Sequence, residues 1–140
     1  MSIDDLAPLI GTWEITGRSY NRDTDNVSGT NTFRPILDGK MLQMTGTIKV
    51  GDFELEAVEM IWFDKETGDF PAHAYNPLGP PDDYRWARTG PDTLTHAGNG
   101  ATYTGTISPD GRTITGAWAP DPGSPTNQVT SYEAVMRKVG

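Results

Sequence analysis

Apolar and polar side chains alternate with a two-residue period along almost the whole 140-residue chain, and this pattern constrains its fold more than any other feature. Such alternation is typical of β-strands that bury one face. Beyond residues 4–11 no segment shows a sustained helical period, so we predict one short helical turn and then strands. The predicted strands are Thr12–Tyr20, Ser28–Arg34, Met41–Val50, Phe53–Phe63, Ala72–Tyr75, Tyr84–Arg88, Thr93–Ala97, Ala101–Ile107, Thr113–Trp118 and Val129–Lys138.

Dipeptides that favour tight turns separate many of these segments. They are Asp38-Gly39, Gly51-Asp52, Thr67-Gly68, Asn99-Gly100 and Asp110-Gly111. Tight hairpins need residues that tolerate positive φ, so successive strands should be antiparallel neighbours. Two proline-rich links, residues 76–83 and 119–127, are predicted as loops at an open rim, because proline cannot donate to a strand ladder.

Many short strands joined by hairpins predict a closed sheet, because closure removes both exposed edges. We therefore expect an all-β fold with a single domain over residues 1–140. It would be an up-and-down antiparallel β-barrel of about 8–10 strands with a short N-terminal helical turn. Five glycines inside the strands predict sharp bends or bulges: Gly17, Gly29, Gly46, Gly105 and Gly116.

Composition excludes several classes of function. The chain has no cysteine, which rules out disulfides, a thiolate nucleophile and metal sites built on sulfur. Its net charge of −8, from 11 basic and 19 acidic residues, argues against nucleic acid as a partner. The acidic start MSIDDLAPLIG does not resemble a secretory signal, and no apolar run reaches the ~20 residues of a membrane span. We expect a cytoplasmic protein with no membrane partner.

The segment Leu9–Trp13 (LIGTW) is a short helix end followed by Gly-x-Trp at the first strand, and it resembles the start of lipocalins and related calycin barrels. Residues 33–39 (FRPILDG) and the ending Met136-Arg137-Lys138 extend the resemblance, which includes bacterial lipocalin-like families. It implies that Trp13 packs at the closed end of the barrel with a basic residue of the last strand, Arg137, across its ring. The LIGTW region is also similar to nitrobindin-type haem barrels, but the last two strands contain no histidine. We therefore expect no haem or other cofactor.

Four residues are candidates for acid–base chemistry: Glu59, His73, His96 and Tyr75. His96 shares its strand face with Leu94, which favours an inward direction. Glu59 lies among inward-leaning apolar residues, and a carboxylate in an apolar pocket can act as a general acid or base. Two alternatives stay open: the histidines are ordinary core or rim residues, and Glu59 is solvated or paired with an arginine such as Arg85.

A second set of residues is predicted to line a ligand pocket. Aromatic side chains on neighbouring strands make a flat, apolar site with polar tips, which suits a planar or hydrophobic molecule. The set is Tyr84, Trp86, Arg88, His96, Tyr103, Trp118, Met44 and Met60. Ordinary core packing is the alternative for each of them. Motifs for phosphate loops, dinucleotides, nucleophile elbows and zinc proteases are absent, and a metal site built from Glu59 and the two histidines is not favoured.

Three functions are compatible with these patterns. The first is binding of a small hydrophobic or aromatic molecule in the barrel interior. The second is a cofactor-free enzyme of the cyclase, isomerase or hydratase type, acting on a bacterial secondary metabolite in the same pocket. The third is a structural or interaction module whose interior is filled by its own side chains. Apolar residues on both faces of residues 53–63 also suggest a homodimer through Met60 and Trp62.

Overall fold

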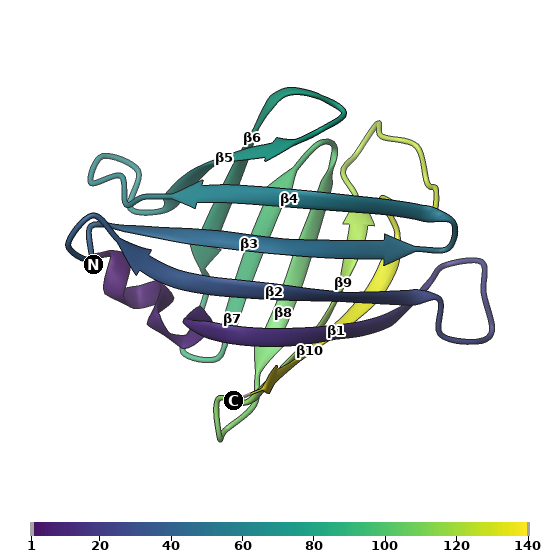
Figure 1. Cartoon of the computed structure of the whole chain (residues 1–140), viewed down its shortest axis with the longest axis horizontal. Helices are drawn as coiled ribbons and strands as arrows, with labels where there is room; N and C mark the ends of the chain where they lie inside the picture. Colours follow the sequence, from purple (N-terminus) through teal and green to yellow (C-terminus); the bar gives the residue numbers. More distant parts are fainter. Residues whose placement is uncertain (1, 140) are drawn as a thin grey trace.

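The computed structural model describes residues 2–139 as one short 3₁₀-helix followed by ten antiparallel strands (Figure 1). The elements are η1 (Ile3–Leu9), β1 (Gly11–Ser19), β2 (Val27–Ile36), β3 (Met41–Val50), β4 (Phe53–Ile61), β5 (Phe70–Asn76), β6 (Gly79–Arg88), β7 (Thr93–Gly98), β8 (Ala101–Ile107), β9 (Thr113–Pro120) and β10 (Tyr132–Val139). Each strand pairs with its neighbours in sequence, and β1 closes against β10. The predicted up-and-down barrel is therefore confirmed, and it is consistent with a lipocalin-like barrel.

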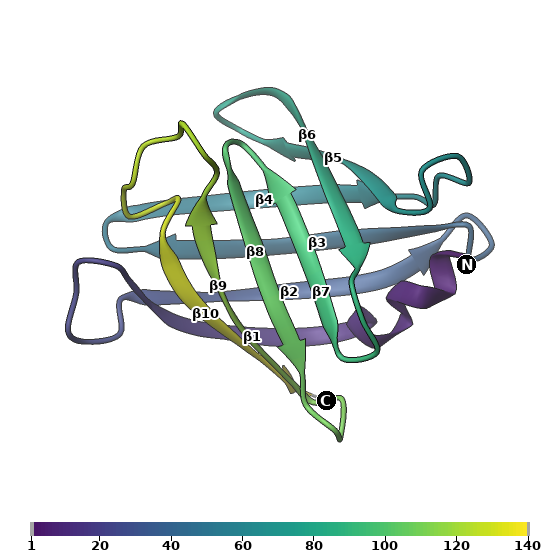
Figure 2. The same ribbon diagram turned by 180° about the vertical axis from the view of Figure 1, so that it is seen from behind.

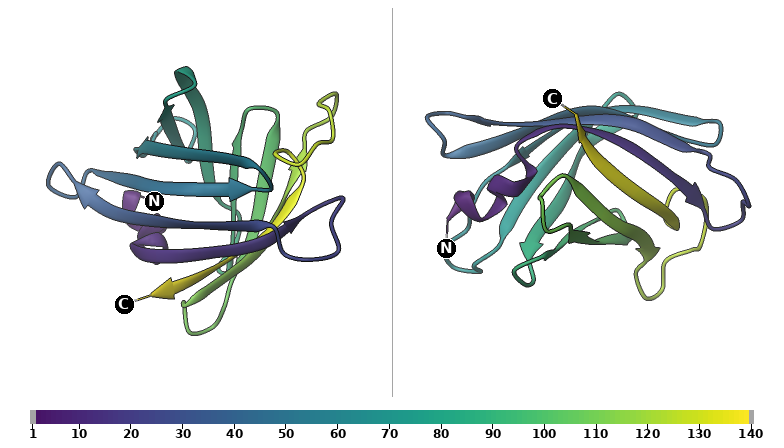
Figure 3. Two further views of the ribbon diagram at one scale, coloured as in Figure 1. Left: turned by 45° about the vertical axis from the view of Figure 1, so that its right-hand side comes forward. Right: turned by 90° about the horizontal axis from the view of Figure 1, so that it is seen from below.

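The barrel is flattened, because β1–β4 run across the molecule while β6–β10 cross them steeply on the other side (Figure 2). Helix η1 covers one end, which we call the closed end, and the β9–β10 loop lies at the opposite end (Figure 3). No helix within residues 2–139 is long and apolar enough for a membrane span.

The alternation seen in the sequence is the alternation of burial in the barrel. In β1, Trp13 and Ile15 are buried, whereas Glu14 and Thr16 are exposed. The predicted turn dipeptides also adopt the positive-φ backbone conformation of tight turns. Their glycines all have positive φ, between 59° and 78°: Gly39, Gly51, Gly68, Gly100 and Gly111. Local turn chemistry and side-chain parity thus specify the same antiparallel register.

A row of small residues crosses four strands on the inner face. Gly17 pairs with Ala134, Ala134 pairs with Gly116, and Gly116 pairs with Gly105. A Cβ atom on Gly17 would lie 1.8 Å from the Glu133 carbonyl oxygen, so no larger residue fits there. The ladder runs through the row without a register shift. These glycines therefore do not mark bulges, and the row leaves interior space.

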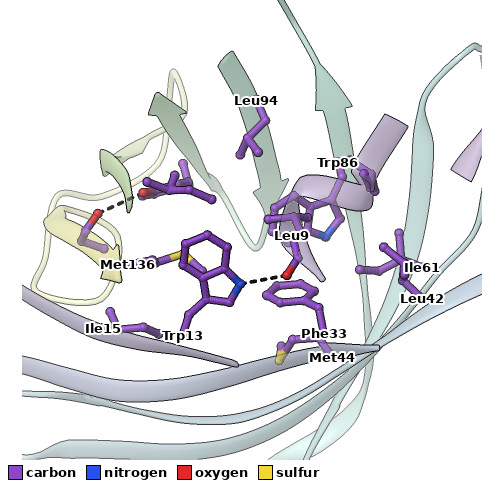
Figure 4. Packing of buried hydrophobic residues seen from close by; sticks show 14 of the residues in the cluster. Leu9, Trp13, Ile15, Phe33, Leu42, Met44, Ile61, Trp86, Leu94 and Met136 are labelled. Atoms are coloured by element: carbon purple, nitrogen blue, oxygen red, sulfur yellow. Dashed lines mark hydrogen bonds between the residues drawn. The ribbon is translucent and has the colours of Figure 1, made fainter. Parts of the chain in front are cut away.

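The closed end is packed around Trp13, which is fully buried (Figure 4). Its indole N–H donates to the carbonyl of Leu9 at 2.8 Å, which ties η1 to the barrel. The basic residue across the ring is Lys138, whose Nζ lies 4.9 Å from the ring centroid, and not Arg137 as the resemblance implied. The alternation of side chains along β10 explains this difference. Lys138 pairs directly with Trp13, whereas Arg137 faces outward and bonds Thr16.

One predicted loop is wrong. Residues 76–83 do not form a long loop, because β6 already begins at Gly79 and Asn76 pairs with Gly79 across a tight hairpin. The ladder shifts register between Ala74 and Asn76, so Pro80 and Pro81 pair with no β5 residue. The two prolines donate no hydrogen bond to β5, and a bulge rather than a loop accommodates them. The other predicted loop is present, shifted to residues 121–131.

Candidate functional site

The barrel interior encloses a cavity of about 290 Å³ that extends from Leu9 of η1 toward the opposite, open end, where the β9–β10 loop lies (Figure 3). Inward side chains of all ten strands line it, Leu9 of η1 contributes from the closed end, and Val129 and Thr130 contribute from the β9–β10 loop. Strand β4 pairs with β5 only over Val58–Ile61, so residues 53–57 have no β5 partner and lie toward the open end. The lining is mainly apolar, with a few polar groups that converge from different strands. A mainly apolar lining with a few convergent polar groups is typical of small-molecule sites.

The polar centre of the cavity is formed by Glu59, Trp86 and His96. Glu59 is only 2% exposed, and one of its oxygens, Oε1, accepts the indole N–H of Trp86. The other oxygen, Oε2, lies 3.0 Å from Nε2 of His96. The imidazole of His96 stacks on the Trp86 indole, with ring centroids 3.8 Å apart and an angle of 11° between the planes. A buried carboxylate is thus held by two nitrogen groups from neighbouring strands.

Strand register explains how these three side chains meet. Trp86 and His96 are direct partners on β6 and β7, so their side chains share a face and can stack. Glu59 lies on β4, two strands away from Trp86. The intervening strand β5 presents the small residues Ala72 and Ala74, which pair with Ile61 and Glu59. Alanines at this level leave the space in which the carboxylate reaches the indole.

Further aromatic rings continue from this centre toward β10. The Tyr84 ring lies 4.9 Å from His96, and Trp118 meets His96 edge-on at 5.3 Å. Trp118 in turn contacts Tyr103 and Tyr132. The rings form a nearly continuous aromatic wall, which favours a flat guest.

The tyrosines of this wall are held in their neutral form. Burial raises the pKa values of Tyr103 and Tyr132 far above the usual value. Burial, and then the charge of Glu59, raise the pKa of Tyr84. The Tyr103 hydroxyl donates to the carbonyl of Ala134 at 2.9 Å. Neutral phenols add hydrogen-bonding capacity to the wall without adding charge.

The charge of the lining is one-sided. Glu59 and Asp82 both line the cavity, whereas no lysine or arginine among the described residues does so. At the mouth, the Asn99 amide donates to Asp82 at 3.1 Å and to the Tyr84 hydroxyl at 3.3 Å. The electrostatic field inside therefore disfavours anions.

Most residues predicted to bind a ligand do line this cavity. They are Met44, Tyr84, Trp86, His96, Tyr103 and Trp118. Met60 and Arg88 do not line it. Met60 pairs with His73 on the outer face of β4, and the guanidinium of Arg88 bonds the carbonyls of Asp5, at 2.8 Å, and Gly90, at 3.0 Å. Arg88 therefore fastens η1 to the β6–β7 turn at the closed end.

Two of the four acid–base candidates lie outside the cavity. His73 faces outward, 3.4 Å from Asp83 and against the ring of Trp62, and Tyr75 is 42% exposed. Both side chains lie on the outward face of β5. The pairing of Glu59 with Arg85 is also wrong, because Arg85 is bonded to Asp69. Glu59 and His96 are the candidates that the structure brings together.

Sequence reasoning missed several lining residues, including Tyr132, Asp82 and Asn99. Tyr132 carried a usable signal, since it alternates with Ala134 and Met136 on the inward face of β10. Asp82 falls within the predicted loop 76–83, for which strand alternation predicts no side-chain direction. The suggested homodimer through Met60 and Trp62 stays a prediction; both side chains are half-buried on the outer face.

A metal site from Glu59 and both histidines is not assembled, because His73 lies on the other face of the sheet. Within residues 2–139 no three His, Asp or Glu side chains are grouped as metal ligands would be. No protein-family model matches the sequence, and neither does any curated protein.

Proposed function

We propose that this chain binds a small hydrophobic or aromatic molecule in the open end of its barrel. The observation that carries this proposal is the cavity of about 290 Å³, walled by aromatic rings and provided with a buried polar centre at Glu59 and His96. Its volume lies at the lower end of the range for ligand pockets, roughly 300–1,000 Å³, so a guest of one or two fused rings fits best. Apolar walls would supply affinity, and the polar centre would supply orientation.

The proposal includes kinship with bacterial lipocalin-like barrels. Supporting it are the ten-strand closed barrel, the N-terminal helix and the buried Trp13 with Lys138 over its ring. A cytoplasmic location is part of the same proposal. Fold alone does not establish function, so the ligand must be argued from the cavity.

A second candidate function, cofactor-free acid–base catalysis on the same guest, is favoured by one observation. Glu59 orients His96 at 3.0 Å inside the cavity, and a carboxylate that orients a histidine is a common arrangement for proton transfer. Incubation of the protein with cell extract, followed by mass spectrometry of the small molecules, would detect such an activity as a mass-balanced substrate loss and product gain. Binding of a small molecule without its chemical conversion would support the first function, ligand binding alone.

Native mass spectrometry of protein purified from the organism that encodes it tests the binding proposal. We expect a fraction of the protein to carry a small molecule of constant mass. An Ala57→Trp variant fills the cavity, since Ala57 lines it, and should reduce that fraction at least about tenfold. The matched control is Ala119→Trp, which adds the same side chain at an exposed position of β9. The binding proposal would be refuted if the wild-type protein were purified without a ligand and also bound no member of a library of small neutral aromatic molecules.

A further inference from the structure

The two ring nitrogens of His96 have different surroundings. Nε2 is bonded to Glu59, whereas Nδ1 takes part in no hydrogen bond among the described residues. Within residues 2–139, no buried side-chain nitrogen or oxygen lacks a partner. Nδ1 is therefore not sealed in protein, and His96 lines the cavity. It is a polar atom available to a guest.

Trp86 occupies one oxygen of Glu59 and leaves the other to His96. An indole N–H is a donor only, so Oε1 of Glu59 accepts from it. An ionised carboxylate can only accept, so Oε2 then pairs with an Nε2–H of His96. A second proton at Nδ1 would create an N–H without any protein acceptor, and an unpaired donor is costlier than an unpaired lone pair. When the imidazole is neutral, Nδ1 therefore carries the lone pair and presents it to the cavity.

The surroundings of Nδ1 select the guest by charge and shape. Glu59 and Asp82 line the cavity without a lysine or arginine to balance them, so an anionic group is repelled. Trp86 covers one face of the imidazole, and Trp118 and Tyr84 pack beside it. A guest therefore lies against aromatic surface while its polar group meets a hydrogen-bond acceptor.

We propose that the guest is an uncharged planar aromatic molecule bearing a hydroxyl or N–H group, which it donates to Nδ1 of His96, with Glu59 as the positioning residue that fixes the tautomer. The inference rests on the proposed function and deepens it by naming the ligand chemistry. Phenols, naphthols and indoles belong to this class, whereas aromatic acids do not.

Calorimetry with three two-ring probes tests the ligand class at about pH 8, where a free imidazole is neutral. They are 2-naphthol, which donates; isoquinoline, which only accepts; and 2-naphthoate, which is an anion. We expect 2-naphthol to bind about tenfold tighter than isoquinoline, the value of one hydrogen bond, and 2-naphthoate not to bind. Equal affinities for 2-naphthol and isoquinoline would overturn the inference and leave the proposed function standing. Binding of none of the probes would overturn both.

Glu59→Gln tests the role of the carboxylate. The glutamine oxygen must face the Trp86 donor, so its NH₂ group must face His96 and donate to Nε2. The proton then moves to Nδ1, and the preference for 2-naphthol over isoquinoline should fall about tenfold. The control is Glu56→Gln, which removes the same charge from an exposed position of β4 and should keep the preference.

Nitrogen-15 spectra of the His96 side chain give a readout that needs neither ligand nor variant. We expect a protonated Nε2 and an unprotonated Nδ1 in the wild type, and the reverse in Glu59→Gln. Addition of 2-naphthol should shift Nδ1 of the wild type. A wild-type Nδ1 that carries a proton would overturn the inference even if the variant failed to fold.

Discussion

Two tryptophans are buried inside this barrel, and the partner of the N–H group distinguishes them. In the packing under η1, Trp13 donates to a backbone carbonyl, that of Leu9, which belongs to the fold itself. At the cavity, Trp86 donates to a buried side-chain carboxylate, that of Glu59. A backbone partner fixes structure alone, whereas a carboxylate partner creates an ionisable centre beside an accessible cavity.

The comparison shows that burial by itself does not separate core from site. Trp13, Phe33 and Trp86 are all nearly inaccessible. The surroundings of Trp86 differ in that charged and aromatic groups meet there around a space, while Trp13 lies in the apolar cluster that includes Leu6 and Leu9. Stability should therefore depend mainly on the packing around Trp13, and binding on the groups around the cavity.

The largest expected effect is on the closed end. Trp13→Ala removes a fully buried indole and the bond that holds η1, so we expect the free energy of unfolding to fall by about 3–5 kcal/mol. Urea denaturation measures the loss. The control is Trp62→Ala, because Trp62 lies half-buried on the outer face and should cost less than half as much. Equal losses would mean that η1 and Trp13 do not anchor the fold.

At the cavity, Glu59→Leu should cost less. It removes the acceptor of two N–H groups, from Trp86 and His96, and unpaired buried donors cost about 1–3 kcal/mol. Glu59→Gln keeps a partner for each ring and should be closer to the wild type. A Glu59→Leu variant as stable as the wild type in urea would show that the polar centre is not needed for the fold.

The buried tyrosines predict a loss of stability in alkali. Burial raises the pKa of Tyr103, so the unfolded chain releases this proton near pH 10 while the folded barrel retains it. Stability is thus complete below about pH 10 and falls as the pH rises, by about 1 kcal/mol for this tyrosine at about pH 11. Urea denaturation at both pH values checks the sign. Tyr103→Phe should reduce the pH dependence, whereas Tyr20→Phe, at an exposed position, should not.

The smallest effect distinguishes two adjacent basic residues. Lys138→Ala removes the cation over the Trp13 ring and should destabilise the protein by about 0.5–1 kcal/mol, the value of an exposed cation–π contact. Arg137→Ala removes an exposed bond to Thr16 and should cost less. Thermal unfolding of both variants decides between them. The reverse order would restore Arg137 to the role that the family resemblance implied.

The fold was largely predictable because its determinants are local. Alternating burial and turn glycines specify each hairpin, and strands Met41–Val50 and Ala101–Ile107 have the predicted bounds. The errors arose where one residue decides parity. Arg137 and Lys138 are adjacent, yet only Lys138 shares the face of Trp13. The structure likewise has a bulge between Ala74 and Asn76 in place of the predicted loop. No local sequence pattern indicates this bulge.

The site was predictable only in part, because it depends on contacts between distant strands. Parity correctly placed Glu59, Trp86 and His96 on inward faces, but nothing in the sequence indicated that Glu59 would bond the other two. Their contact depends on the small residues Ala72 and Ala74 in the strand between them. His73 and Tyr75 resemble His96 and Tyr84 in type, and only the register of β5 shows that they face outward.

The four indole N–H resonances of the protein offer the most direct test of the central claim, that the cavity accepts a guest and the packing around Trp13 does not. Trp86 and Trp118 line the cavity, whereas Trp13 and Trp62 do not. During a titration with 2-naphthol, two-dimensional ¹H–¹⁵N spectra should show shifts of the Trp86 and Trp118 indole signals, with those of Trp13 and Trp62 unchanged. Shifts of Trp13 or Trp62 alone, or no shift at saturating 2-naphthol, would contradict the account.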